Sequence, residues 1–271
     1  MSATDRAKSK AATTYNAAAD SYDAGFWDRY GRRSVERLNL RPGARVLDVA
    51  SGTGASALPA AEAVAPEGSV IAVDLAEKML ERARAKALTR GLRNIEFKLG
   101  DMTALGYPDA CFDAVVCVFG VFFVSDMKAL VAELWRMVRP HGKLAVTTWG
   151  PRIFEPMYSR WNEAVRAERP DLQAAFNPWD RIVDPTAVTR LFEDAGVLAM
   201  DVVAESGLQQ LATPEDWWTI VLGSGLRWTV EMLGPEAAER VKRDNLDWAR
   251  TNAVDSVETN VIYAVATKPG C

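Results

Sequence analysis

The chain has 271 residues, of which 49% are hydrophobic and 25% are charged, and its formal net charge is −4 at pH 7. This length fits one α/β domain with insertions or at most two domains, and the apolar fraction is enough for a substantial core. The acidic balance argues against a general nucleic-acid binder, which would carry a basic face, and the apolar run 115–124 is too short to span a bilayer.

The first ten residues are polar and show no hydrophobic segment of a secretory signal. Three cysteines, Cys111, Cys117 and Cys271, lack the spacing of metal ligands, and Cys117 lies in a strand-like apolar run. We interpret Cys117 as a small apolar core residue of a protein in a reducing compartment. We therefore expect a cytoplasmic protein without a metal site.

In chain order, residues 1–12 are polar and are expected to be frayed. Residues 13–30 combine alanines with five aromatic side chains, and residues 31–40 predict a helix with Val35 and Leu38 turned inward. The sequence then turns at residues 41–43 into an apolar strand at residues 46–49.

A glycine-containing loop at residues 50–54 separates that strand from an alanine-rich helix at residues 55–65. Gly52 and Gly54 let the backbone approach a ligand without a Cβ in the way. The free N–H groups and positive dipole end of the following helix also point toward this position. A turn of this kind, at the carboxyl end of a parallel strand, is where open α/β sheets bind nucleotide-like ligands.

Two kinds of ligand fit this loop. Gly52, Gly54, Ala57 and the later Asp74 match the dinucleotide pattern, so an NAD enzyme is one possibility. Asp48 argues against it, because a carboxylate repels a pyrophosphate but attracts an ammonium group. Asp101 follows the third strand and can accept a hydrogen bond from an adenine amino group.

The next elements alternate between strands and amphipathic helices. In the first of these helices, Met79, Leu80, Ala83 and Ala87 recur at helical spacing. An unbroken apolar run, as in the fourth strand, suits a parallel strand that is covered on both faces. The expected order is strand 70–75, helix 76–90, strand 95–99, strand 115–119, helix 126–138 and strand 143–149.

Beyond Trp149 the composition changes, because residues 150–185 are rich in proline and aromatic side chains. Seven of the nine tryptophans lie at or after Trp149. They either line a cleft for an apolar or aromatic small molecule or form the core of an inserted cap. The remaining expected elements are helix 186–195, strand 198–204, helical segments within 213–250 and a final strand at 257–267.

Five ordered motifs resemble those of the class I S-adenosylmethionine-dependent methyltransferases. They are the glycine loop 47–54, the strand 70–75 with its acid, the turn 100–102, the strand 112–117 and the turn 138–144. The resemblance is good over residues 15–149, and over the rest of the chain it extends only to the general pattern of elements. In pattern, the chain is similar to ubiquinone/menaquinone C-methyltransferase-like enzymes and small-molecule O-methyltransferases.

The resemblance implies an α/β fold with a Rossmann-like, doubly wound, seven-stranded sheet of order 3-2-1-4-5-7-6. The last strand is antiparallel, and a helical substrate cap is added. The implied division of the chain is a helical lid at 1–40, a cofactor-binding core at 41–150, cap insertions at 151–185 and 213–250, a core continuation at 186–212 and the final core strand at 251–271.

The implied cofactor is S-adenosyl-L-methionine, and the implied partner is a small-molecule methyl acceptor. The resemblance, read with the aromatic pattern, assigns candidate residues to two sets. The cofactor set is Tyr22, Asp48, Ala50, Ser51, Gly52, Gly54, Asp74, Leu75, Met79, Asp101, Met102, Val118 and Phe119. The substrate-pocket set is Phe26, Phe122, Phe123, Trp149 and Trp179. For Met79 and the aromatic residues, simple core packing is the competing interpretation.

The sequence departs from the family pattern in two places. Ala50 stands where the family loop usually has glycine, and we expect its methyl group to be tolerated. The relatives similar in pattern often carry histidine after strand four, but this chain has Val121, Phe122 and Phe123 there. The sole histidine, His141, lies in a turn and is expected to be a surface residue.

The sequence therefore does not identify the catalytic residues. Tyr15, Tyr22 and Glu155 are weak candidates for the general base. Without a strong base near the fourth strand, the sequence favours a methyl acceptor that is already nucleophilic. Three arginines, Arg152, Arg160 and Arg181, either bind an acidic substrate group or are ordinary surface residues. The expected reaction is in-line methyl transfer to an oxygen, nitrogen or carbon nucleophile. The alternatives are a non-methylation reaction such as cyclisation, or a non-catalytic cofactor-binding module; no oligomeric state is predicted.

Overall fold

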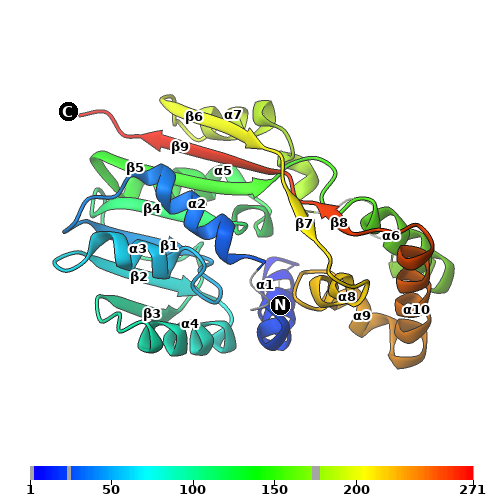
Figure 1. Cartoon of the computed structure of the whole chain (residues 1–271). Coiled ribbons are helices and arrows are strands. Elements are labelled where there is room, and N and C mark those ends of the chain that lie inside the picture. The colour runs from blue at the N-terminus through cyan, green and yellow to red at the C-terminus, as the bar shows by residue number, and fades with distance from the viewer. Residues whose placement is uncertain (1–2, 23–25, 173–177, 271) are drawn as a thin grey trace.

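The computed structural model describes residues 3–22, 26–172 and 178–270. A seven-stranded sheet of order β3-β2-β1-β4-β5-β9-β6 forms the centre of the molecule (Figure 1). Its strands are β1 (Arg45–Val49), β2 (Ser69–Asp74), β3 (Ile95–Leu99), β4 (Phe112–Val118), β5 (Val138–Trp149), β6 (Met200–Glu205) and β9 (Val261–Thr267). Strands β1 to β5 pair in parallel, whereas β9 pairs antiparallel with both β5 and β6. The expected strand order and the antiparallel last strand are confirmed.

Helices cover both faces of this sheet (Figure 1). Along β1, Val46 packs into the cluster beneath α2 (Asp28–Leu38) and α3 (Ala57–Val64). Its neighbour Leu47 packs into the opposite cluster, which includes α5 (Met127–Met137) and α7 (Pro185–Asp194). Successive side chains of a strand point to opposite faces, so an unbroken apolar run is required where both faces are covered.

The first helix departs from the expectation. Residues 3–12 are not frayed, because α1 (Ala3–Tyr22) is a continuous helix of 20 residues. Its Ala18 and Ala19 pack against Ala76 and Met79 at the start of α4 (Glu77–Thr89). Within residues 3–12, Lys8 forms an ion pair with Asp101 and Lys10 lies over the Trp228 ring. Tertiary contacts therefore support a helix where the polar composition predicts a free end.

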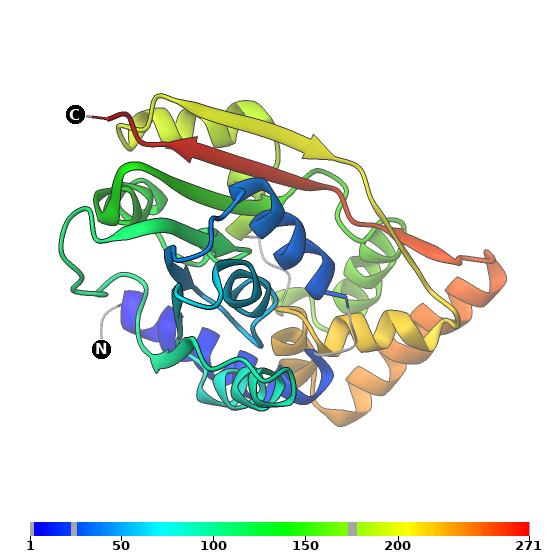
Figure 2. The same ribbon diagram turned by 60° about the vertical axis from the view of Figure 1, so that its left-hand side comes forward.

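The final strand is also divided, because β8 (Ser256–Glu258) and β9 replace the continuous strand expected at 257–267. β8 pairs antiparallel with β7 (Leu208–Gln210), a strand that the sequence pattern did not indicate. The chain runs from β6 into β7 and from β8 into β9, so these two connections join the sheet to the segment that contains α8 (Glu215–Leu222), α9 (Arg227–Leu233) and α10 (Pro235–Thr251) (Figure 2). The apolar run from 115 and the strand expected from 143 both start too late, since β4 and β5 begin at Phe112 and Val138. The strand motif at 112–117 gives the start of β4 correctly.

The cap consists of α6 (Met157–Glu168), α8 (Glu215–Leu222), α9 (Arg227–Leu233) and α10 (Pro235–Thr251), gathered beyond one end of the sheet (Figure 1). The buried indole of Trp217 donates a hydrogen bond from Nε1 to Oδ1 of the buried Asn245, 3.0 Å away. Trp161 and Trp218 pack with ring centroids 5.8 Å apart. These tryptophans form the core of the cap, which settles their role in favour of packing.

Candidate functional site

The glycine loop after β1 contains three residues with positive φ, namely Ala50 (55°), Gly52 (52°) and Gly54 (89°). At Gly54 a Cβ would lie 2.9 Å from Cγ of Leu58, so the loop can pass here only without a side chain. At Ala50 the methyl group is accommodated, because its neighbour Gly120 has no side chain. A Cβ on Gly120 would lie 2.6 Å from the Ala50 Cβ.

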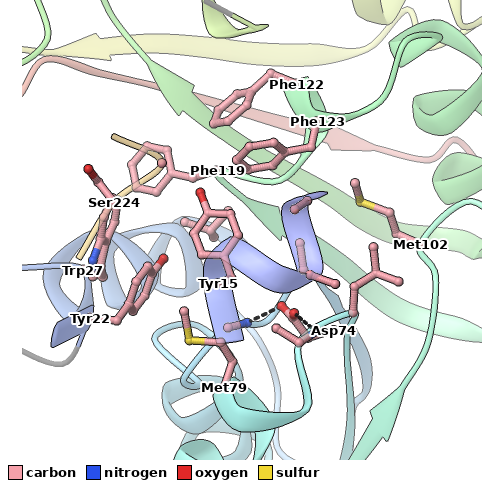
Figure 3. Close-up of a pocket in the computed structure, with 18 of the residues that line it drawn as sticks. Tyr15, Tyr22, Trp27, Asp74, Met79, Met102, Phe119, Phe122, Phe123 and Ser224 are labelled. Atoms are coloured by element: carbon pink, nitrogen blue, oxygen red, sulfur yellow. Dashed lines mark hydrogen bonds between the residues drawn. The ribbon is translucent and has the colours of Figure 1, made fainter. Parts of the chain in front are cut away.

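Asp74 ends β2 and faces this loop (Figure 3). Its two carboxylate oxygens accept hydrogen bonds from the backbone N–H groups of Gly52 at 2.8 Å and Ala76 at 2.9 Å. Burial raises the pKa of the Asp74 carboxyl, and the backbone hydrogen bonds oppose that shift. The remaining lone pairs of these oxygens are available to a hydroxyl group in the adjoining cavity.

Asp48 lies beneath the loop and is fully buried. Its Oδ2 accepts a hydrogen bond from Oγ of Ser56 at 2.7 Å, whereas its Oδ1 has no partner. Burial, with a further contribution from the charge of Asp74, raises the pKa of Asp48 to about 8. The structure thus holds an incompletely satisfied carboxyl group behind the loop, and Asp48 is not part of the cavity wall.

Asp101 also lies off the cavity wall. It accepts a hydrogen bond from Nζ of Lys8 on α1 at 2.5 Å and further hydrogen bonds from the backbone N–H and hydroxyl of Thr103, both at 2.8 Å. Burial raises the pKa of this carboxyl, but these hydrogen bonds outweigh it and keep the pKa below its usual value. Lys8 was not singled out from the sequence, because only the tertiary fold brings it to Asp101.

A cavity of about 1010 Å³, its open mouth included, extends from Asp74 past the carboxyl ends of β1, β2 and β4 to the cap. Helix α1 contributes Tyr15 and Tyr22 to its wall (Figure 3). Fourteen residues expected from the sequence line it: Tyr15, Tyr22, Ala50, Gly52, Asp74, Leu75, Met79, Met102, Val118, Phe119, Phe122, Phe123, Trp149 and Trp179. Five do not: Asp48, Ser51, Gly54, Asp101 and Phe26.

The end of the cavity away from Asp74 is aromatic. Phe119 and Trp149 stack with ring centroids 3.9 Å apart and an interplanar angle of 17°. Trp27 meets Phe119 edge to face at 5.7 Å, and Phe123 meets Tyr15 in the same way at 5.6 Å. Phe26 lies behind this wall, buried and 6.2 Å from the Trp149 ring.

Several wall residues were missed by sequence reasoning. Trp27 belongs to an aromatic segment that drew attention, yet it was not assigned to the pocket. Val73 and Gly100 lie within the recognised motifs 70–75 and 100–102 but were not assigned to the site. The others carry no recognisable motif: Ala11, Ala12, Ala76, Ile153, Phe154, Ser224, Gly225 and Leu226. Residues 224–226 join α8 to α9, so their place depends on how the cap folds over the sheet.

Tyr15 is a poor proton acceptor at neutral pH. Burial, followed by the charge of Asp74, raises the pKa of Tyr15 well above its usual value, so its hydroxyl stays protonated and can donate a hydrogen bond. Tyr22 stacks on Trp27, with ring centroids 4.8 Å apart. Its hydroxyl lies 3.9 Å from the position that a Cβ on Gly52 would take.

The other candidates for acid–base or metal chemistry lie elsewhere. Glu155 accepts a hydrogen bond from the hydroxyl of Ser159 at 2.8 Å and is not part of the cavity wall. His141 lies in the turn within β5, where its backbone N–H donates to the carbonyl of Lys268. Among the residues that the structure describes, no group of three or more His, Cys, Asp or Glu side chains is placed to hold a metal ion.

The cavity fits an adenosyl amino acid. The carboxylate of Asp74 faces it, the Cβ-free Gly52 leaves space between the loop and Tyr22, and Leu75, Met79 and Met102 provide apolar surface for a base. The site lies at the carboxyl ends of the central parallel strands, where open α/β sheets bind nucleotide-like ligands. The fold and the site together define a Rossmann-like cofactor-binding enzyme domain.

Residues 46–142 match the family model of a methyltransferase domain. The chain is 34% identical over 169 residues to demethylmenaquinone methyltransferase of Renibacterium salmoninarum, covering 62% of this chain and 68% of that protein. It is also 34% identical over 170 residues to nocamycin O-methyltransferase of Saccharothrix syringae, covering 59% and 60%. The chain therefore belongs to the class I S-adenosylmethionine-dependent methyltransferases. The aligned segments span about half to two thirds of these curated relatives.

Solved structures share the same fold. The YcgJ protein of Bacillus subtilis superposes with a TM-score of 0.61 at 21% identity, covering 90% of this chain and all of that one. A putative methyltransferase of Bacillus halodurans gives 0.58 at 21% identity, covering 88% and 98%. In the part of the chain that the structure describes, no helix is both long and apolar enough to cross a membrane.

Proposed function

We propose that the protein transfers the methyl group of S-adenosylmethionine to an oxygen, nitrogen or carbon nucleophile of a small, uncharged aromatic or apolar molecule. One observation carries this proposal: a single cavity joins the glycine loop and Asp74 at one end to a wall of aromatic rings at the other. The first end suits an adenosyl amino acid, and the second suits a flat apolar acceptor.

The cofactor, when bound, supplies an electrophilic methyl group. In this proposal Asp74 accepts hydrogen bonds from the ribose hydroxyls, the backbone of the glycine loop faces the amino-acid end, and Met79 and Met102 flank the base. Asp48, behind the loop, contributes negative charge near the cofactor's amine once it is ionised. Ser51, Gly54 and Asp101 act indirectly, by shaping the loop or by holding α1.

The remaining task of the chain is to align the acceptor and exclude water. Phe119, Trp149, Phe122 and Phe123 present rings to the acceptor space, and α1 covers the cavity beside them. Asp74 is the only carboxylate among the described wall residues, and it lies at the cofactor end. We therefore infer that the acceptor is nucleophilic without strong base assistance, as a phenol, an enol or an amine is, and that Tyr15 donates a hydrogen bond to it.

The relatives support an acceptor of this size. They are named as demethylmenaquinone methyltransferase, nocamycin O-methyltransferase and aklanonic acid methyltransferase, the last at 34% identity over 66% of its length. Each name specifies a small-molecule substrate. The charge of −4 on this chain agrees with an acceptor of low molecular weight better than with nucleic acid.

The division of the chain follows from the same cavity. We propose residues 1–40 as the lid, 151–185 and 213–250 as the cap, and the intervening segments with the last strand as the cofactor-binding core. Contacts from α1 to α4, α8 and α9 support a lid that touches both core and cap. A cytoplasmic location is part of the proposal, supported by the free thiols of Cys111 and Cys117.

The test is incubation with S-adenosylmethionine labelled in its methyl group and a panel containing 2-naphthol, catechol, a cyclic 1,3-diketone and an aromatic amine. Transfer of label to at least one of them is the expected result. Conversion of an added compound without label transfer would instead indicate a reaction such as cyclisation. Calorimetric binding of S-adenosylhomocysteine without any reaction would indicate a binding module, and binding of NAD in its place would overturn the proposal.

A further inference from the structure

Two short segments that are distant in sequence build one side of the aromatic wall. Phe122 and Phe123 come from η1 (Val121–Phe123), and Trp179 comes from η3 (Pro178–Ile182). The rings of Phe122 and Trp179 meet edge to face with centroids 6.0 Å apart. Helices of the 3₁₀ type are short and weakly hydrogen-bonded, so other contacts must fix how these rings lie.

One side chain joins the two segments. The guanidinium group of Arg181 donates hydrogen bonds to the carbonyl oxygens of Phe122 at 3.1 Å, Val124 at 3.0 Å and Ser125 at 3.2 Å. Arg181 lies on η3, two residues after Trp179. This one side chain therefore ties η3, which carries Trp179, to the turn that carries Phe122 and Phe123. A planar fork of five N–H donors suits three converging carbonyls, whereas an ammonium group is a compact point charge.

The beginning of the η1 turn is fixed independently. The backbone N–H of Phe119 donates to the carbonyl of Thr147 on β5 at 2.9 Å, which ties the end of β4 to the sheet. Gly120 then packs so closely that a Cβ there would lie 2.8 Å from Sγ of Cys117. The turn is therefore anchored at its start by the sheet, and its far end is anchored by Arg181.

We propose that Arg181 is a positioning residue that sets the width of the acceptor half of the cavity. The inference rests on the proposed function for the identity of that half. Arg181 is not part of the cavity wall, and the three bonds described direct its donors at the backbone of the turn. Its role is thus to hold Phe122 and Phe123 against Trp179, not to bind an acidic substrate group.

The test compares Arg181→Ala, Arg181→Lys and Arg190→Ala. Arg190 is an exposed arginine on the adjacent α7 and serves as the matched control. With each protein saturated with S-adenosylhomocysteine, binding of 2-naphthol is measured by calorimetry. We expect Arg181→Ala to weaken this binding roughly tenfold or more, since small misplacements of positioning groups have large effects. Arg181→Lys should recover part of the loss, and Arg190→Ala should match the unmodified protein.

Affinity for S-adenosylhomocysteine should stay within about twofold in all three variants, because the turn lies at the opposite end of the cavity from Asp74. A proportional loss of both affinities would mean that Arg181 supports the fold as a whole, and the inference would be wrong. Unchanged 2-naphthol binding in Arg181→Ala would equally overturn it.

A second measurement separates this inference from the proposed function. Hydrogen exchange of the peptide covering residues 119–126 should accelerate in Arg181→Ala and not in Arg190→Ala, with no ligand present. If the unmodified protein binds no 2-naphthol but this difference in exchange is seen, the proposed acceptor class fails while the positioning of the turn stands. Equal exchange in the two variants would refute the role of Arg181.

Discussion

Lys8 and Asp101 form an ion pair, with Nζ and Oδ2 2.5 Å apart, between helix α1 and the loop after β3. The family resemblance assigns Asp101 to adenine, yet in this structure its carboxylate holds the helix that covers the cavity. Both side chains are partly exposed, so the pair by itself contributes little to overall stability. Its consequence is local, because α1 supplies two tyrosines to the cavity wall.

This relationship predicts a measurable coupling between Lys8 and Asp101 in cofactor affinity. Lys8→Met should weaken binding of S-adenosylhomocysteine about two- to fivefold, on the scale of a partly exposed ion pair, and the loss should shrink at high salt. Asp101→Asn should weaken binding of S-adenosylmethionine and S-adenosylhomocysteine alike. Calorimetry at two salt concentrations makes the comparison.

The double variant distinguishes the two roles of Asp101. If Asp101 only holds the lid, Asp101→Asn should have the same effect as Lys8→Met, and combining them should add nothing. If it also contacts adenine, Asp101→Asn should cost more than Lys8→Met. Wild-type affinity in both single variants would remove the lid pair from cofactor binding altogether.

Asp74 is predicted to carry the largest single polar contribution to cofactor binding. Asp74→Ala should weaken affinity for S-adenosylhomocysteine by about 1–3 kcal/mol, the range for losing a charged hydrogen-bond partner. Asp201→Ala, which removes an exposed carboxylate on β6, is the matched control and should have no effect. A calorimetric affinity unchanged by Asp74→Ala would contradict the ribose assignment, provided that circular dichroism shows the same fold.

The buried carboxyl of Asp48 predicts that stability depends on pH. Its pKa is about 8 in the folded chain and 3.8 in the ordinary reference state, so between these values the folded state binds more protons than the unfolded state. The free energy of unfolding from this group is therefore highest below about pH 4 and falls as pH rises toward about 8. Denaturant unfolding at about pH 5 and about pH 8.5 should show the decrease.

Asp48→Asn should reduce this pH dependence and raise stability at the alkaline end, because the amide is neutral and its oxygen can still accept from Ser56. Burial shifts the pKa of Asp74 in the same direction, so a residual slope is expected. A slope in the variant equal to that of the wild type would mean that Asp48 does not titrate in this window.

The close approach of Ala50 and Gly120 predicts a compensating pair. Gly120→Ala should destabilise the fold by about 1–3 kcal/mol, as overpacking of a tight core does. Ala50→Gly should recover part of that loss, because it removes the methyl group with which the new side chain collides. Recovery should be incomplete, because Sγ of Cys117 lies almost as close as the Ala50 methyl.

Thermal unfolding of the single and double variants gives the interaction energy directly. Strict additivity would show that the two positions do not share space. Ala50→Gly alone should change stability by less than about 1 kcal/mol. Glycine removes the strain of the left-handed backbone at this position, but it also makes the unfolded chain more flexible, and the two effects oppose each other.

The sequence alone was sufficient to predict the strands of the seven-stranded sheet and many of the residues that line the cavity around Asp74. The apolar run 115–118 predicts a strand that is covered on both faces. Gly52 and Gly54 mark a backbone with positive φ. These signals are local, since each depends on residues that adjoin in the chain. Strand order followed from the family resemblance, and the acid Asp74 reaches the glycine loop because both follow neighbouring parallel strands.

Tertiary structure alone decided the rest. Lys8 contacts Asp101, and Arg181 contacts the turn after β4, although dozens of residues separate the two partners in each case. Ser224 lies on the cavity wall, far in sequence from the glycine loop. No sequence periodicity connects these residues. Of the tryptophans after Trp149, only packing decided that Trp217 belongs to the cap core and Trp179 to the cavity. Burial depends on what another segment places against a side chain, and that information is spread over the whole chain.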